Sequence, residues 1–185
     1  MEAPLALLPQ SHLRLADLTN RKATDFDLTP TAPERQAIAD ALGISGVKKL
    51  KFSGQLEPIG RGDWGLVGKL GATIVQPCVA TLSPVTTRID EPVARNYVAD
   101  LPEIDASEAE MPEDDTIEAL PASLDLAAVM IEALTLALPL YPRSPDANVG
   151  DTAVAPPGVT PMTDDDAKPF AGLGALREQL ENKEK

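Results

Sequence analysis

The stretch Lys49-Leu50-Lys51-Phe52-Ser53-Gly54-Gln55-Leu56-Glu57 shows the clearest two-residue periodicity in the chain. Its odd positions are polar, and its even positions hold leucine, phenylalanine or glycine. Successive side chains of a β-strand point to opposite faces of a sheet. The alternation therefore predicts a strand with one buried face and one face in water, which is typical of an antiparallel sheet.

The residues after this strand predict a hairpin. Gly60-Arg61-Gly62-Asp63 is a turn sequence, rich in residues that tolerate positive φ. Apolar residues then line one face of a second strand, namely Leu66, Leu70, Ala72 and Ile74.

A third long strand is expected from Val85 to about Val98, interrupted at Glu91-Pro92. Proline has no N–H to donate to a β-ladder, so this interruption indicates a sheet edge or a bulge. Shorter strands are expected at Ser11 to Leu18 and at Thr116 to Leu120. We expect the long strands to form an antiparallel meander that closes into a barrel-like sheet.

Two helices are expected beside this sheet. Thr31-Ala32-Pro33-Glu34 has the form of a capping box, and the helix that it begins ends at Gly43. Ser123 is expected to cap one long apolar helix from Leu124 to Leu138, which Pro139 ends. Apolar residues at helical spacing predict that this helix covers the sheet: Leu124, Ala127, Ala128, Ile131, Leu134 and Leu138.

The acidity of the chain lies in its second half. Residues 1–95 carry 11 Lys or Arg and 10 Asp or Glu, residues 96–185 carry 5 and 19, and the net charge is −13. Residues 103–118 hold eight acids and no Lys or Arg, which predicts a flexible acidic loop. A surface that repels phosphate cannot use the counterion release that drives nucleic-acid binding. RNA contact is therefore expected only in the first half.

The chain, at 185 residues, is long enough for one domain with a substantial core. We expect a single α+β domain over residues 1–143. Residues 144–167 are rich in proline and small residues, which predicts a flexible linker. Over residues 168–185 a C-terminal docking helix is expected from apolar residues at helical spacing, namely Phe170, Leu173, Leu176 and Leu180.

Several features predict a cytoplasmic protein without a membrane partner. Cys78 is the only cysteine, which excludes an intrachain disulfide and fits a reducing compartment. The N-terminal residues lack the basic and apolar regions of a secretory signal. The most apolar stretch, Leu124 to Leu140, is shorter than a membrane span and contains Asp125 and Glu132.

The sequence offers little for catalysis. His12 and Cys78 are the only soft metal ligands, whereas a structural zinc site needs four, so no metal or other cofactor is expected. Cys78 has no base near it in sequence and is expected to be a small buried residue at a strand end. Because P-loop, dinucleotide-binding and nucleophile-elbow motifs are absent, we expect the protein not to be an enzyme.

One hairpin combines cations with an aromatic residue. Lys49, Lys51 and Trp64 lie near further cations at Lys48, Arg61 and Lys69, a combination used by stacking platforms for single strands. The alternative, which the small number of charges favours, is that the lysines form the solvated face of a strand and that Trp64 closes the core. No DNA partner is expected.

Three short motifs follow one another along the chain. They are Cys78-Val79-Ala80-Thr81-Leu82-Ser83-Pro84-Val85, then Glu132-Ala133-Leu134 with Leu138-Pro139-Leu140-Tyr141-Pro142-Arg143, and finally Lys168-Pro169-Phe170-Ala171 with Leu173 and Leu176. In this order and spacing they resemble the YceD family of bacterial and plastid proteins, which is linked to the accumulation of large-subunit ribosomal RNA. Where that family often has Leu-Glu-Pro after the cysteine, this chain has Leu82-Ser83-Pro84.

The resemblance implies a non-catalytic factor in large ribosomal subunit biogenesis that supports accumulation or processing of large-subunit (23S) rRNA. It implies large-subunit ribosomal proteins or a pre-ribosomal particle as partners, with rRNA as a further contact. The motifs add binding candidates: Cys78, Thr81, Pro84, Pro169, Phe170, Leu173 and Leu176. The alternatives are an interaction adaptor unrelated to ribosomes and an RNA-processing enzyme that holds Mg²⁺ with Asp125, Glu132 and Asp165.

Overall fold

The computed structural model describes residues 8–60, 62–100, 116–147, 155–156, 158–160 and 162. The chain divides into two units, residues 1–145 and 146–185, and all assigned helices and strands lie in the first. In chain order they are β1 (His12–Arg14), the short 3₁₀ helix η2 (Leu15–Asp17), β2 (Thr24–Leu28), α1 (Ala32–Ala41), β3 (Gly46–Ile59), β4 (Asp63–Pro77), β5 (Pro84–Val98), β6 (Ile117–Ala119), β7 (Ser123–Asp125) and α2 (Leu126–Leu136).

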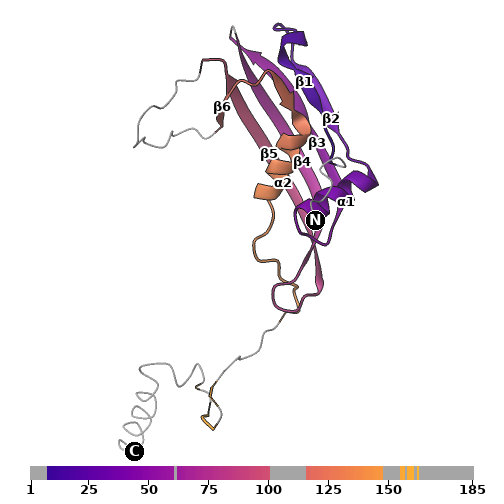
Figure 1. Ribbon diagram of the computed structural model, residues 1–185, viewed down its shortest axis with the longest axis vertical. Helices are drawn as coiled ribbons and strands as arrows, with labels where there is room; N and C mark the ends of the chain where they lie inside the picture. Colours follow the sequence, from indigo (N-terminus) through magenta and orange to yellow (C-terminus); the bar gives the residue numbers. More distant parts are fainter. Residues whose placement is uncertain are drawn as a thin grey trace, which may run out of the picture. The chain divides into compact units, whose positions relative to one another are not determined.

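The architecture is α+β, with one five-stranded sheet and two α-helices in the described part of the chain (Figure 1). The sheet order is β2-β3-β4-β5-β6, and every neighbouring pair is antiparallel except β5 and β6, which are parallel. A separate two-stranded ribbon pairs β1 with β7, joining His12 to Asp125. The predicted meander of three long strands is therefore confirmed in β3, β4 and β5.

The expectation of a barrel-like sheet is wrong. The edge strands β2 and β6 do not pair with each other, so the sheet is open among the described residues. These edge strands are 5 and 3 residues long, whereas the three central strands have 14 or 15 residues. A barrel needs strands that stay paired around a closed ring, and such short edges cannot provide this pairing along the central strands.

The two faces of the sheet differ in chemistry. On β3 and β4 the even-numbered apolar residues point to one face and are buried there, including Phe52, Leu56, Leu66 and Leu70. Figure 1 shows α2 lying across the sheet, and its Met130 and Leu134 belong to the same core. The odd-numbered residues between them point to the opposite face, which carries polar side chains. The alternation in the sequence thus predicts both faces correctly.

The apolar helix is shorter than predicted and begins later. Ser123 was expected to be its cap, but Ser123–Asp125 form β7 and the N-cap is Asp125. The Asp125 carboxylate accepts hydrogen bonds from the Ala127 amide at 3.0 Å and from the Ser11 amide at 2.9 Å. The cause is tertiary, because pairing with β1 keeps these residues extended. In the described part of the chain, no helix has both the length and the apolar character needed to cross a bilayer.

The first helix follows its sequence signals. The Glu34 carboxylate accepts hydrogen bonds from the amide and the hydroxyl of Thr31, both at 2.7 Å. In the predicted capping box the Glu34 side chain accepts from the backbone N–H of the N-cap residue, as it does here. The two hydrogen bonds lower the pKa of Glu34. The predicted interruption of the third strand at Glu91-Pro92 is wrong, because β5 is continuous from Pro84 to Val98. The edge expected at Pro92 is confirmed among the described strands, because only β4 pairs with β5 there and β6 pairs with Asn96 to Val98.

Candidate nucleic-acid interface

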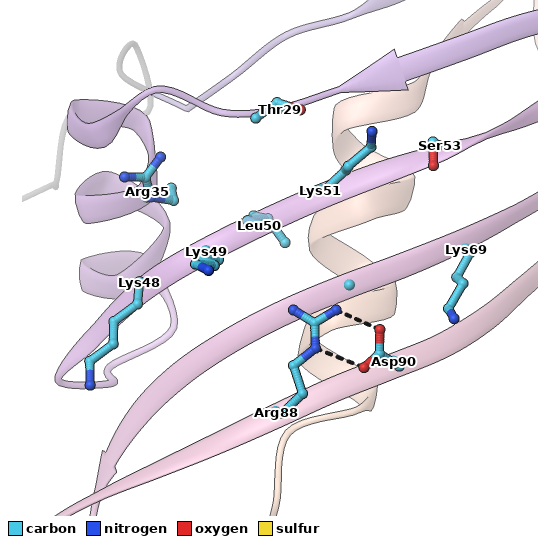
Figure 2. A pocket seen from close by; sticks show the side chains of 11 residues that line it. Thr29, Arg35, Lys48, Lys49, Leu50, Lys51, Ser53, Lys69, Arg88 and Asp90 are labelled. Carbon is cyan, nitrogen blue, oxygen red and sulfur yellow. Dashed lines mark hydrogen bonds and ion pairs between the residues drawn. The ribbon is translucent and has the colours of Figure 1, made fainter.

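A groove of about 610 Å³ lies on the polar face of the sheet. We call it the cationic groove, and Figure 2 shows it from that face, with α2 on the far side of the strands. Its lining residues come from α1, β3, β4, β5 and the segment after β2: Thr29, Arg35, Lys48, Lys49, Leu50, Lys51, Ser53, Lys69, Gly71, Arg88 and Asp90. Six of these are cations and one is an acid, although the whole chain has a net charge of −13.

Strand register determines which cations face one another. Lys49 pairs with Thr73, which in turn pairs with Arg88, so Lys49 and Arg88 lie in one row across three strands. Two residues further along β3, Lys51 pairs with Gly71 and Gly71 pairs with Asp90. A register shift between Val47 and Lys49 inserts Lys48 as an extra residue in β3. Because of this bulge, Lys48 and Lys49 are both exposed although they are consecutive.

Two of the six cations are paired with acids on the same face. Arg88 donates to both Asp90 oxygens, from Nε at 2.7 Å and from Nη2 at 2.6 Å, as the dashed lines in Figure 2 show. These hydrogen bonds lower the pKa of Asp90, to which Lys69 also contributes, and raise the pKa of Arg88. Lys51 pairs with Asp27 at 2.7 Å and lowers its pKa.

The other four cations form no ion pair within the described part of the chain, although Lys69 is close enough to Asp90 to lower its pKa. Arg35 donates to the backbone oxygens of Pro30 and Val47, which holds its guanidinium beside β3. Lys48 donates to the Thr86 hydroxyl at 3.1 Å. Lys49 and Lys69 make no ion pair with a described residue. The groove therefore keeps an excess of positive charge that a polyanion can use.

A glycine forms the floor of the groove. Gly71 lies between Lys51 and Asp90 in the register of the sheet. A Cβ atom added to Gly71 would come within 2.8 Å of Arg88 Nη2. The missing side chain thus leaves room for the Arg88 guanidinium and a shallow floor between the cations.

Among the residues predicted for nucleic-acid binding, the structure separates the lysines from the tryptophan. Lys49 and Lys51 line the groove, whereas Trp64 is 4% exposed and belongs to the core on the opposite face. Trp64, Leu66 and Leu70 lie at even-numbered positions of β4 and therefore point to the same, buried face of the sheet. The position of Trp64 thus follows from strand periodicity. It pairs across strands with Tyr97, which is also buried. Trp64 therefore offers no stacking surface at this hairpin.

Cys78, Thr81 and Pro84 lie elsewhere, at the end of the hairpin formed by β4 and β5. Cys78 is fully buried, and its amide donates to the Ser83 oxygen at 2.8 Å. The Ser144 amide donates to the Cys78 sulfur at 3.4 Å, and the Val79 amide donates to the Pro142 oxygen at 2.9 Å. The first two sequence motifs are thus joined in space.

The environment of the thiol favours its charged form. Hydrogen bonds from the Thr81 side chain and from the Ser144 amide lower the pKa of Cys78 to about 6, and burial opposes them. The side chain has no surface exposure, so a thiolate there acts as a hydrogen-bond acceptor inside the fold. The remaining candidates, Pro169, Phe170, Leu173 and Leu176, lie outside the described residues, as does most of the acidic loop.

An apolar groove of about 560 Å³ adjoins the joined motifs. Its lining is uncharged: Leu42, Gly43, Ile44, Gln76, Pro77, Val79, Thr135, Leu136, Leu138, Pro139, Leu140 and Pro142. Gln76 is 8% exposed, and its amide nitrogen donates to the Pro139 oxygen. Its Oε1 atom has no hydrogen-bond partner among the described residues. Leu136 and Leu140 are largely exposed on this surface.

The acids of the magnesium hypothesis do not converge where they are described. Asp125 caps α2, and Glu132 accepts from Arg95 at 3.0 Å; Asp165 lies outside the described residues. Within the described ranges, no group of three or more His, Cys, Asp or Glu side chains could hold a metal ion.

The sequence interpretation missed Arg35, Arg88 and Asp90. Arg88 and Asp90 have a usable signal, since residues two apart on a strand share a face. Arg35 has none, because its approach to β3 depends on how α1 packs.

Fold and site together define a small α+β domain: an open sheet with an apolar helix on one face and a cationic groove on the other. The family model described as "Large ribosomal RNA subunit accumulation protein YceD" matches residues 66–177. This match spans more than half of the 185 residues, and the chain belongs to the YceD family. Lys69 and Arg88 lie within the matched range. No curated protein and no solved structure gives a significant match.

Proposed function

We propose that this protein supports the accumulation of large-subunit ribosomal RNA as a non-catalytic factor of the cytoplasm that binds RNA through the cationic groove. The observation that carries the proposal is the local reversal of charge: six cations and one acid gather on one sheet face of a strongly acidic chain. The family match supplies the link to large ribosomal RNA.

The proposed binding of RNA to the cationic groove should weaken with increasing salt concentration by a predictable amount. A cation that neutralises a phosphate releases a counterion, so the logarithm of the binding constant falls by about 0.7 to 0.9 per decade of salt for each contact. The four cations that form no ion pair with described residues are enough to give a measurable slope of the logarithm of the binding constant against the logarithm of the salt concentration. The acids of the second half of the chain limit non-specific binding by repelling nucleic acid from other surfaces.

The test is RNA binding by the wild type and by Lys49→Gln/Lys69→Gln. Both lysines are exposed and make no ion pair with described residues, so their replacement removes no ion pair of the described fold. We expect the double variant to bind a large-subunit rRNA fragment more weakly, with a salt slope smaller by about 1.5. Lys22→Gln, an exposed lysine outside the groove, is the matched control. Unchanged affinity and slope in the double variant would reject the groove as the RNA site.

The cellular test expresses the wild type and the same variants in a strain depleted of this protein. If the proposal holds, the wild type and Lys22→Gln restore large-subunit rRNA, and Lys49→Gln/Lys69→Gln does not. Normal rRNA levels with the double variant would show that RNA binding at the groove is not what supports accumulation.

A second candidate is binding to a protein, and the apolar groove favours it. The uncharged lining and the unpaired Gln76 Oε1 suit an apolar peptide that supplies one N–H donor. We propose a large-subunit ribosomal protein or a pre-ribosomal particle as this partner. Crosslinking through a photoreactive residue at Leu140, which is 84% exposed, tests the contact, and crosslinks only to proteins unrelated to the ribosome would support the adaptor alternative.

A further inference from the structure

We infer, on the basis of the proposed function, that the RNA held by the cationic groove is an A-form duplex, recognised through its phosphates and 2′-hydroxyls and not through its bases. Proteins bind single strands largely by stacking bases on aromatic side chains, whereas they recognise duplex RNA by its shape and backbone. The chemistry of the groove distinguishes between these two modes.

None of the described residues that line the groove is aromatic. Phe52 and Trp64 of the same hairpin and Tyr97 of β5 are buried on the opposite face. Phe26 of β2 is 8% exposed and lines a neighbouring hollow that shares Ser53 and Lys69 with the groove. Tyr141 is the one strongly exposed aromatic residue in the described ranges, and it does not line the groove. The described lining can therefore contact a nucleic-acid backbone but offers no exposed aromatic ring on which to stack unpaired bases.

The cations are spread over a surface and do not follow a single line. Lys49 and Arg88 are two strands apart, about 10 Å, and Lys49 and Lys51 lie about 7 Å apart along β3. Lys69 lies in the next row, where it pairs with Ser53. Figure 2 shows these side chains rising from three adjacent strands. A two-dimensional array of charges over a flat floor suits the wide, shallow minor groove of A-form RNA and the phosphates on both of its sides.

Hydroxyl groups accompany the cations. Thr29 and Ser53 line the groove, and Thr86 accepts a hydrogen bond from Lys48 beside it. A hydroxyl can donate to a phosphate or exchange hydrogen bonds with a 2′-hydroxyl. The 2′-hydroxyl is the group by which a protein distinguishes RNA from DNA, so this lining favours RNA.

Asp90 limits the strength of this site and provides a gain-of-function test. Its carboxylate neutralises Arg88 and lies in the row next to Lys69. Asp90→Asn keeps the size of the side chain and removes the negative charge. Tighter binding by this variant cannot be explained by partial unfolding.

The experiment measures fluorescence anisotropy with a labelled RNA duplex of about 20 base pairs, either strand alone, and the DNA duplex of the same sequence, at several salt concentrations. We expect the full chain to bind duplex RNA at least about tenfold more tightly than it binds either RNA strand alone or the DNA duplex. Asp90→Asn should tighten duplex binding, Lys69→Gln should weaken it and lower the salt slope by about 0.9, and Lys22→Gln should change neither.

Each contrary result has a separate meaning. Single strands bound as tightly as the duplex would overturn the duplex inference and leave the proposed RNA-binding function standing. Equal binding of the DNA duplex would overturn recognition of the 2′-hydroxyl. Absence of salt-dependent binding to any RNA would overturn both the inference and the proposed function.

Discussion

At the level of single residues, Cys78 combines complete burial with a pKa lowered to about 6. Because the folded-state pKa lies below the ordinary thiol value, the thiolate stabilises the fold fully above about pH 9, and this contribution is lost as pH falls through about 6. We expect the difference in unfolding free energy between wild type and Cys78→Ala to grow as pH rises from about 6 to 9. Urea unfolding at several pH values measures it, and a difference that stays constant would contradict the lowered pKa.

Arg95 links three elements through its guanidinium. Its Nε atom contacts Glu118 of β6 at 2.8 Å, and its Nη2 atom contacts Glu132 of α2 at 3.0 Å. The arginine is 17% exposed but both acids are about half exposed, so solvent screens the pairs. We expect Arg95→Met to lower the unfolding free energy by about 1 kcal/mol. A double-mutant cycle with Glu132→Gln isolates one pair, and a coupling energy of zero would show that this pair does not hold α2.

Residue positions within a strand follow from sequence periodicity, but contacts between strands do not. The alternation around Lys49 and Lys51 places both side chains in water. Trp64 lies two residues before the buried Leu66 on the same strand, so it points to the same face and belongs to the core. Arg88 meets these lysines only through the register of β3, β4 and β5. Register depends on turn geometry and on pairing between distant segments, so the complete groove could not be predicted from one sequence.

At the level of elements, Asp125 joins the start of α2 to the N-terminal strand. Its Oδ1 atom accepts hydrogen bonds from both Ala127 and Ser11. We expect Asp125→Ala to lower the unfolding free energy by about 1 to 2 kcal/mol, as loss of a helix cap does. Asp125→Asn keeps an oxygen acceptor and serves as the control in thermal unfolding. Equal stability of Asp125→Ala and wild type would exclude this capping role.

The pairing of β3 and β4 includes two glycines opposite each other, Gly54 and Gly68. A Cβ atom at Gly54 would clash with the Val67 carbonyl oxygen, and the ring of Phe26 lies 2.9 Å from its ideal position. We expect Gly54→Ala to lower the unfolding free energy by about 2 kcal/mol or more, because backbone must move. Gly46→Ala is the matched control on the same strand, since no atom lies within 4 Å of its added Cβ. Similar stabilities for the two variants would contradict the close approach.

Local sequence signals predict elements well where local interactions decide them. The capping-box hydrogen bond of Glu34 in α1 and the hairpin between β3 and β4 are cases of this kind. The start of α2 was misplaced because Ser123–Asp125 pair with β1, more than 100 residues away. Such a tertiary contact overrides the cap preference of Ser123, and sequence periodicity does not reveal it.

At the level of the whole molecule, every buried residue of the described core lies between Leu15 and Leu134. We therefore expect a fragment of residues 1–145 to fold on its own and to unfold in one cooperative transition. Calorimetry of the fragment and of the full chain tests this, and a fragment without a cooperative transition would contradict it. A clearly lower melting temperature for the fragment would show that residues 146–185 stabilise the domain, as a docking helix over residues 168–185 would.

The α+β class was predictable, but closure of the sheet was not, because edge pairing depends on the lengths of β2 and β6.

The charge difference between the two halves of the sequence also has a counterpart in the fold. The cationic groove is built from residues before position 91, and the acidic surplus follows it in the chain.

The ribbon of β1 and β7 sets the order of events while the chain is being made. β3, β4 and β5 are complete once Val98 has been added, but β1 has no partner strand until Asp125 follows. At about 5 to 20 residues per second, this delay lasts roughly 1 to 6 seconds. During that interval α2 has not yet been synthesised, so the apolar face of the meander has no helix to cover it. The cationic face needs neither α2 nor the ribbon, because its lining residues all precede position 91.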